Sequence, residues 1–222
     1  MTPEELAELH PCLFHITPPD TWSSIKKTGL LSTTTALDIY EINGAERKII
    51  EESIRKQTFI LEHPEYEKLT INDNLPLQKG PLKKSLEDGL GVADWCKILN
   101  KRVFFWSDEK GMQRLLQARM NKNRRRDVLV LDTLSVASEH PYRIELCAIN
   151  SGAAMRRAAK RGDTTFSPLE KYDYETWRRL RGKKDRILEI TVLGKLPAVE
   201  AHILSLRKYD SGTLVGEETF KR

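Results

Sequence analysis

The chain has 222 residues, of which 39% are apolar and 31% are charged, and its formal net charge is +5 at pH 7. This length and apolar content suffice to build a core, so we expect one domain over residues 1–222 and exclude wholesale disorder. Three scattered cysteines exclude a disulfide scaffold, and neither a secretory signal nor a membrane-length apolar run is visible, so we expect a cytoplasmic protein without a membrane partner.

Helices are predicted in short pieces along the chain. A strand at 12–17 ends at Pro18-Pro19, and the helix that follows over 21–28 is terminated by Gly29. Further helices are expected over 35–56 with a break at Asn43-Gly44, over 82–88, over 92–99, and from Ser107 as the capping residue to Met120. In this first half of the chain, the predicted strands and helices therefore do not alternate regularly.

Strands recur throughout the rest of the sequence. Runs of β-branched and aromatic residues predict them at 58–62, 68–71, 102–106, 128–132, 143–149, 186–192 and 202–209. Residues 121–127 predict a basic turn, 151–168 a long loop, and the last dozen residues a frayed end. Because helices and strands do not alternate regularly, the sequence favours an α+β fold over a doubly wound sheet.

Several common catalytic motifs are missing from the sequence. Neither GxGxxG nor GxxxxGK[ST] occurs, which argues against a Rossmann dinucleotide site and against a P-loop. The histidines are scattered without an HExxH pair, and His63-Pro64-Glu65 lacks the PCxxC partner of a zinc deaminase. We therefore expect no metal site.

Two strands carry side chains of chemical interest. On the strand at 12–17, His15 and Thr17 share a face and together suit hydrogen bonding to a ribose or a carboxamide, although a polar edge strand with a satisfied histidine is the default explanation. In RVFFW, Phe104 and Trp106 share one face while Val103 and Phe105 share the other, so the aromatic rings can serve a core or stack on a flat ligand.

Two glutamates interrupt apolar strands near the C-terminus. Glu189 in RILEITV and Glu145 in RIELCAIN each face either solvent or a site, and solvent is the default for a carboxylate. The loop at 150–169 is long and basic, which fits either a functional lid or a solvated surface. The sequence also contains four basic groups, which fit either an anion-binding surface or a solubilising one: Arg124–Arg126, Arg156–Arg157, Lys160–Arg161 and Arg178–Arg181.

Two resemblances follow from these segments. The run FHIT…I..GLLS, from Phe14 to Ser32, resembles the first strand and NAD-binding element of the ADP-ribosyltransferases of the DarT type, and ILEITVLGKLPAVEAHI is similar to the region around their catalytic glutamate. Nearly the whole chain resembles an uncharacterised bacterial domain-of-unknown-function family (number seven-zero-zero-two), with the shared stretches GLLST, RVFFW, INSG and RG..TF.P. The second resemblance implies no activity.

The first resemblance implies an α+β, ADP-ribosyltransferase-like fold with split antiparallel or mixed sheets surrounded by short helices. It also implies NAD+ as co-substrate and an acceptor for ADP-ribose. Glu189 would be the catalytic carboxylate, with Glu145 as the alternative, and His15 would bind the adenosine ribose. The other residues that the resemblance places at the NAD+ site are Thr17, Gly29 and Leu30, with Phe105 or Trp106 on the nicotinamide and Arg119 or Arg161 on the pyrophosphate.

Differences from the ADP-ribosyltransferase family narrow the range of acceptors that we expect. The second strand lacks the tyrosine of diphtheria-type enzymes, and Ile187 stands where arginine-modifying members carry Gln or Glu, so a nucleobase in DNA or RNA or a small molecule is favoured over protein arginine. The RGDTTF loop also differs, around Asp163, from the domain-of-unknown-function family, and the role of Asp163 is therefore open. Two alternatives remain: a catalytically inactive nucleotide- or nucleic-acid-binding module on the same scaffold, and a basic nucleic-acid-binding protein without a dinucleotide site.

Overall fold

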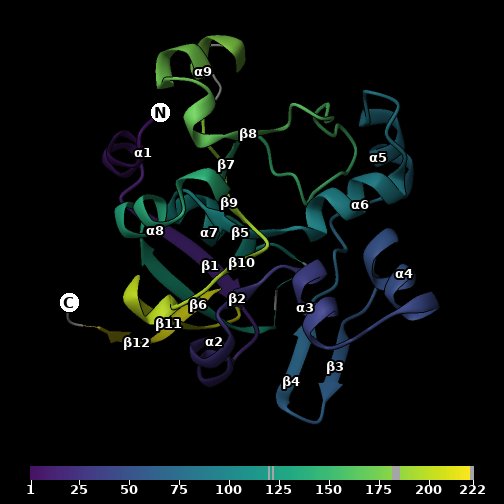
Figure 1. Cartoon of the computed structure of the whole chain (residues 1–222), viewed down its shortest axis with the longest axis vertical. Helices are drawn as coiled ribbons and strands as arrows, with labels where there is room; N and C mark the ends of the chain where they lie inside the picture. Colours follow the sequence, from purple (N-terminus) through teal and green to yellow (C-terminus); the bar gives the residue numbers. More distant parts are fainter. Residues whose placement is uncertain (120, 122, 182–185, 221–222) are drawn as a thin grey trace.

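A computed structural model describes residues 1–119, 121, 123–181 and 186–220 of the chain (Figure 1). In this part, eight strands form one sheet in the order β12-β11-β6-β1-β5-β9-β7-β8, and every neighbouring pair in it is antiparallel. Their bounds are β1 Cys12–Thr17, β5 Arg102–Trp106, β6 Arg125–Asp132, β7 Ile144–Cys147, β8 Phe166–Pro168, β9 Glu189–Leu193, β11 Ile203–Asp210 and β12 Thr213–Thr219. Antiparallel strands with short helices confirm the expected α+β class.

Short helices surround this sheet. They are α1 Pro3–Leu9, α2 Trp22–Thr28, α3 Thr33–Ile39, α4 Gly44–Glu52, α5 Lys79–Ser85, α6 Val92–Asn100, α7 Glu109–Leu116, α8 Thr133–Glu139 and α9 Tyr174–Arg181, with 3-10 turns η1 Pro141–Arg143, η2 Leu169–Lys171 and η3 Val199–Ala201. In the described part, no helix is long and apolar enough to cross a membrane.

The sheet is closely paired on one side of β1 and opens on the other. Six residue pairs join β1 to β6, whereas a single pair, Phe14 with Trp106, joins β1 to β5. Beyond that pair the two strands diverge, and the His15 ring donates a hydrogen bond from Nδ1 to the Phe104 carbonyl at 2.9 Å in place of the strand ladder. The divergence leaves room for a cleft at the middle of the sheet.

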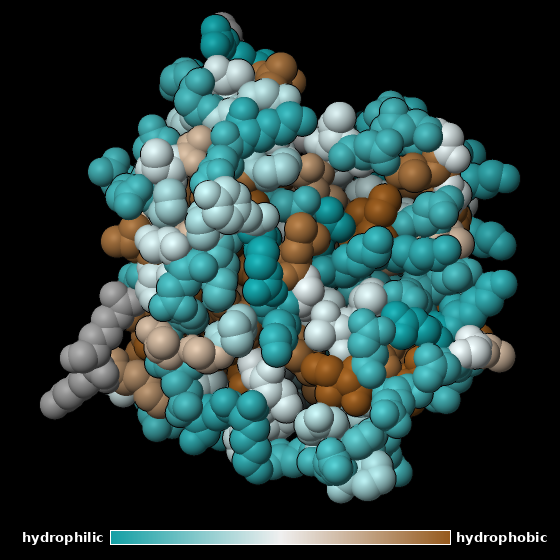
Figure 2. All heavy atoms as spheres, viewed as in Figure 1, coloured by the Kyte–Doolittle hydropathy of each residue, from teal (hydrophilic) through white to brown (hydrophobic). Residues whose placement is uncertain are grey.

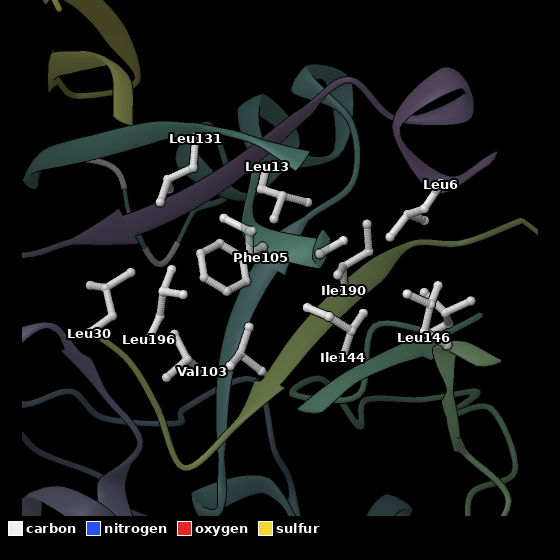
Figure 3. Close-up of a cluster of buried hydrophobic side chains, with 14 of the residues drawn as sticks. Leu6, Leu13, Leu30, Val103, Phe105, Leu131, Ile144, Leu146, Ile190 and Leu196 are labelled. Atoms are coloured by element: carbon white, nitrogen blue, oxygen red, sulfur yellow. The ribbon is translucent and has the colours of Figure 1, made fainter. Parts of the chain in front are cut away.

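One face of the sheet supplies the main core. Leu13, Leu131, Phe105 and Ile190 come from four neighbouring strands and point toward one another (Figure 3). Full burial of each such side chain stabilises the fold by about 1.5–3 kcal/mol. The ring of Phe105 is 1% exposed in this core, so of the two rings expected at a nicotinamide, Phe105 and Trp106, the partly exposed Trp106 is the better placed.

The other face of the sheet is also covered. Phe14, Val128 and Val130 pack there against Met112 and Leu116 of α7. Because both faces of β1 meet apolar partners, Leu13 and Phe14 are both buried, and the strand is central in the sheet rather than a polar edge strand. Continuous burial of successive residues is what a strand covered on both faces requires.

A smaller unit of structure packs beside the opening. The β3–β4 hairpin (Phe59–His63 and Tyr66–Ile71) lies against α3 and α4 around Leu37, Ile50 and Leu61, on the side of the molecule away from α1 and α8 (Figure 1). Strands β2 (Leu30–Leu31) and β10 (Lys195–Leu196) pair nearby. Gly29 has φ +79°, and a Cβ there would collide with the Leu196 carbonyl oxygen, so glycine is required where the chain leaves α2.

Several expected boundaries differ from the structure. The end of the chain is expected to be frayed, but β12 (Thr213–Thr219) pairs there with β11 through a two-residue turn in which Ser211 and Gly212 both have positive φ; residues 221 and 222 lie outside the described part. Ser107 does not cap α7; Asp108 does, and the Ser107 hydroxyl donates to the Ile187 carbonyl instead. The expected helix end at Met120 lies outside the described residues, and α7 ends at Leu116.

Candidate functional site

The opening between β1 and β5 forms a cleft. Two adjoining cavities of about 330 and 290 Å³ share seven lining residues, so they are continuous. His15 and Thr17 line the first cavity, and Glu189 lines the second. The residues common to both cavities are Thr33, Arg55, Asp73, Arg102, Phe104, Trp106 and Leu115. Two segments at opposite ends of the sequence thus meet in one cleft.

The histidine end of the cleft is preorganised. Burial lowers the pKa of His15, so the imidazole is neutral near pH 7. Because Nδ1 donates to the Phe104 carbonyl, Nε2 carries the lone pair and suits a hydroxyl donor. The Thr21 hydroxyl donates to the Pro18 carbonyl at 3.0 Å and lies 2.9 Å from the Thr17 hydroxyl, which fixes the start of α2 beside the cleft.

Gly29 and Leu30, which follow α2, also line the first cavity. The glycine lets the chain turn close to Leu196, and Leu30 is buried at 4% exposure in the main core. Their contribution to the cleft is therefore to shape its wall.

The glutamate end of the cleft is a buried carboxylate. Glu189 is 5% exposed and is held by Ser151, whose hydroxyl donates at 2.6 Å and whose backbone N–H donates at 3.1 and 3.2 Å. Burial raises the pKa of Glu189 to about 7, against the opposing effect of the Ser151 hydrogen bonds and of Arg161. The group can therefore exchange a proton close to neutral pH, as functional carboxylates often do.

The alternative carboxylate has a different setting. Glu145 on β7 forms a two-bond ion pair with Arg102, at 2.7 Å from Nε and 3.1 Å from Nη2. Both side chains are about one-tenth exposed. Glu145 is not among the residues that line the two cavities, so the geometry favours Glu189 as the carboxylate that meets a ligand.

The aromatic residues of β5 divide between the cleft and the core. Phe104 and Trp106 are partly exposed and line both cavities, whereas Phe105 lines only the cavity at Glu189 and its side chain is buried in the main core. Trp106 lies directly opposite Glu189 in the strand register. A flat ligand group beside Glu189 would therefore meet Trp106, with Phe104 one step further along the strand.

Arg55 is a cleft residue that the sequence analysis missed. It is 9% exposed, and its Nε and Nη1 donate to oxygens of Asn72, Ile50 and Asn100 at 2.8–2.9 Å. Burial lowers the pKa of Arg55, but an arginine stays charged in proteins. Nothing in the local sequence IRKQTF marks this arginine, because its role depends on partners brought in by the fold.

The two arginines expected at a pyrophosphate lie elsewhere. Arg119 is exposed and lies outside the lining of the described cavities. Arg161 is 2% exposed and turns inward, donating to the Ser151 carbonyl at 3.0 Å and lying 5.6 Å from the ring of Trp95. Arg161 therefore supports the loop that holds Glu189. The side chain of Asp163 is exposed, and its backbone N–H donates to Asp88.

A third cavity adjoins the cleft. It measures about 480 Å³ and shares Trp106, Asp73 and Asn150 with the cavity at Glu189. Arg114, Arg124, Arg126 and Arg186 line it, and Arg124 is paired with Asp73 at 3.1 Å. Of the basic groups singled out in the sequence, only Arg124 and Arg126 line this cavity, whereas Arg178 lies on α9 and Arg161 is buried; the side chain of Arg181 lies outside the described part.

Comparison with known proteins places the chain in a family. The profile of a family of unknown function, DUF7002, matches residues 11–203. The chain belongs to this family. A search of curated proteins found no match. Among solved structures, the chain is similar to Thermosipho africanus DarTG in complex with ADP-ribose, at 13% identity and a TM-score of 0.45.

That structural match covers 86% of the present chain but only 42% of the DarTG chain, so the present chain spans less than half the length of DarTG. Such a distant likeness does not establish an activity.

Proposed function

We propose that the chain is an NAD+-dependent ADP-ribosyltransferase, with the cleft between β1 and β5 as the active site. One observation carries the proposal: the two segments whose motifs resemble that enzyme class, around His15 and around Glu189, line the two ends of one continuous cleft. A sequence resemblance built on short motifs gains weight when the fold brings those motifs together. The same geometry supports Glu189 and His15 as the catalytic pair.

The proposed reaction is a glycosyl transfer. The bond between the nicotinamide nitrogen and ribose C1′ breaks, and nicotinamide leaves with the electron pair. Positive charge develops on the ribose, and the acceptor forms the new bond to C1′ and loses its proton. Ionised Glu189 would accept a hydrogen bond from the ribose hydroxyl and stabilise that charge, an effect that is strong because the carboxylate is buried and prepositioned by Ser151.

The rest of the cleft fits the other parts of a dinucleotide. The lone pair of His15 Nε2 suits a ribose hydroxyl, and Thr17 lies two residues further along the same strand. Trp106 or Phe104 would stack on the nicotinamide. Arg55 stands where both cavities meet and would bind the pyrophosphate through Nη2, since arginine suits phosphate geometry.

A more specific part of the proposal is the class of molecule that accepts the ADP-ribose. The third cavity lies beside Trp106 and is lined by four arginines and one aspartate, and this excess of positive charge favours an acceptor with negative charge. A nucleobase in DNA or RNA would bring phosphates to those arginines and a flat ring to the tryptophan. Binding of such an acceptor should weaken as salt concentration rises.

The test is nicotinamide release from NAD+ by the purified chain, measured by NMR with and without single-stranded DNA, RNA or cell extract. Release that requires one of these additions would support the transferase and identify the acceptor class. Saturable NAD+ binding without release under any condition would overturn the enzyme in favour of the inactive nucleotide-binding module. Absence of NAD+ binding would overturn the dinucleotide site itself.

A further inference from the structure

Three potential metal ligands meet away from the cleft, where α8 ends and β11 begins. Glu139 is the last residue of α8, His140 follows it, and His202 directly precedes β11. One ligand atom from each of the three lies within 4.8 Å of the other two. None of these residues lines the three cavities described above. The cluster is therefore independent of the proposed active site.

One spacing in this cluster is close to that of a metal centre. Glu139 Oε2 lies 3.6 Å from His202 Nε2. Two ligand atoms bound to a tetrahedral zinc ion at about 2.0–2.1 Å would be roughly 3.3–3.4 Å apart. The rings of His140 and His202 are inclined at 69° with their centres 6.1 Å apart, which lets their edges converge.

His140 supplies a second and independent indication. Its Nε2 is buried and has no hydrogen-bond partner among the described residues. A buried polar nitrogen without a partner is costly, so such an atom calls for an explanation.

The outer contact of His202 also fits a ligand. Its Nδ1 lies 2.7 Å from the Ser135 hydroxyl, which fixes the ring with Nε2 toward Glu139. Metal-binding histidines commonly donate their other ring N–H to an oxygen in this way. Ser135 is itself fixed by the N-cap of α8, where its backbone N–H donates to Asp132.

We propose that Glu139, His140 and His202 bind a divalent metal ion of the zinc class. Two imidazoles and one carboxylate form a ligand set that zinc accepts, with water at the fourth position. The expectation of no metal site rested on the absence of an HExxH pair, but these ligands come from distant segments that only the fold brings together. The bound ion would join the end of α8 to the start of β11. This inference does not depend on the proposed transferase activity.

The test uses the full chain after removal of metal by a chelator. Zinc binding is measured by competition with a chromophoric chelator, and cobalt absorption reports the coordination geometry. We expect one zinc ion per chain and a higher melting temperature with zinc. Ser135→Ala should weaken zinc affinity by about 10–100-fold, as loss of an outer partner usually does.

Ligand variants decide the proposal. Glu139→Gln alters an exposed side chain and should leave folding intact, and His140→Asn removes the second ligand. Both should lose more affinity than Ser135→Ala, whereas His63→Asn, in the β3–β4 hairpin, should bind zinc like the unmodified chain. Zinc affinity that is the same in the unmodified chain, Glu139→Gln and His140→Asn would overturn the site. Failure of the unmodified chain to bind zinc would overturn it equally.

Discussion

Two glutamates on neighbouring strands have very different environments. Glu145 on β7 and Glu189 on β9 are both less than one-tenth exposed, and both were ambiguous in the sequence. Arg102 neutralises Glu145 through two hydrogen bonds, whereas Glu189 is held by the uncharged Ser151 and borders the cleft. The partner of each carboxylate, rather than its place in a strand, decides whether it stabilises the fold or is available to a ligand.

The largest expected effect concerns activity. Glu189→Gln should lower the rate of nicotinamide release by about 10²–10³-fold, because it removes the charge that stabilises the transition state. NAD+ affinity should change little. Glu145→Gln, assayed on its folded fraction, should retain most of the activity. A Glu189→Gln protein with the full rate would contradict the difference that we draw between the two carboxylates.

The next effect concerns stability. Glu145→Gln should lower the free energy of unfolding by about 3–5 kcal/mol, because it leaves the nearly buried guanidinium of Arg102 without its counter-charge. Urea unfolding would measure this loss. The double variant Arg102→Met with Glu145→Leu should recover much of it, since an apolar pair leaves no uncompensated charge. An unchanged midpoint in Glu145→Gln would show that the ion pair is not structural.

Local patterns were sufficient to predict the elements around the histidine end of the cleft. The strand ending at Thr17, the helix ending at Gly29 and the break at Asn43-Gly44 depend on neighbouring residues, and the structure confirms them. The C-terminal strand β12 was missed because it is almost wholly exposed and is defined by its pairing with β11. That pairing follows from the turn at Ser211-Gly212, which the sequence analysis did not recognise.

The glutamate end could not be resolved from sequence for a related reason. Ser151 lies 38 residues from Glu189, and Arg102 lies 43 residues from Glu145, so neither partner could be assigned by spacing. The burial of Phe105 and the inward turn of Arg161 likewise depend on which face of the sheet the core occupies. Such contacts are tertiary, and a single sequence does not specify them locally.

A third prediction uses the pH dependence of stability. Burial raises the folded-state pKa of Glu189 to about 7 from an ordinary 4.5, so the folded protein binds more protons than the unfolded chain between these values. Stability should therefore fall as pH rises from about 4.5 to 7, by on the order of 3 kcal/mol, since one pKa unit corresponds to about 1.4 kcal/mol.

Denaturant unfolding at a series of pH values would measure that slope. In Glu189→Gln this contribution should vanish, while Glu145→Gln should keep it. The rate of nicotinamide release should change in the opposite sense and rise with pH through about 7, because the ionised carboxylate is the active form. A pH-independent difference between Glu189→Gln and the unmodified chain would contradict the raised pKa.

The smallest effect tests what holds Glu189 in place. Ser151→Ala removes the hydroxyl that donates at 2.6 Å but keeps the backbone N–H, which donates at 3.1 Å. A hydrogen bond to a charged group contributes about 1.5–3 kcal/mol, so its loss should raise the pKa of Glu189 further and lower the rate at pH 7 by about tenfold. The rate should recover at higher pH, which a merely misfolded variant would not do.

Ser167→Ala is the matched control, because the hydroxyl of Ser167 is also buried but makes no hydrogen bond among the described residues, and its pH–rate profile should be unchanged. If the profile of Ser151→Ala also stayed in place, Ser151 would not set the ionisation of Glu189, and the distinction between the two glutamates would have to rest on Arg102 alone.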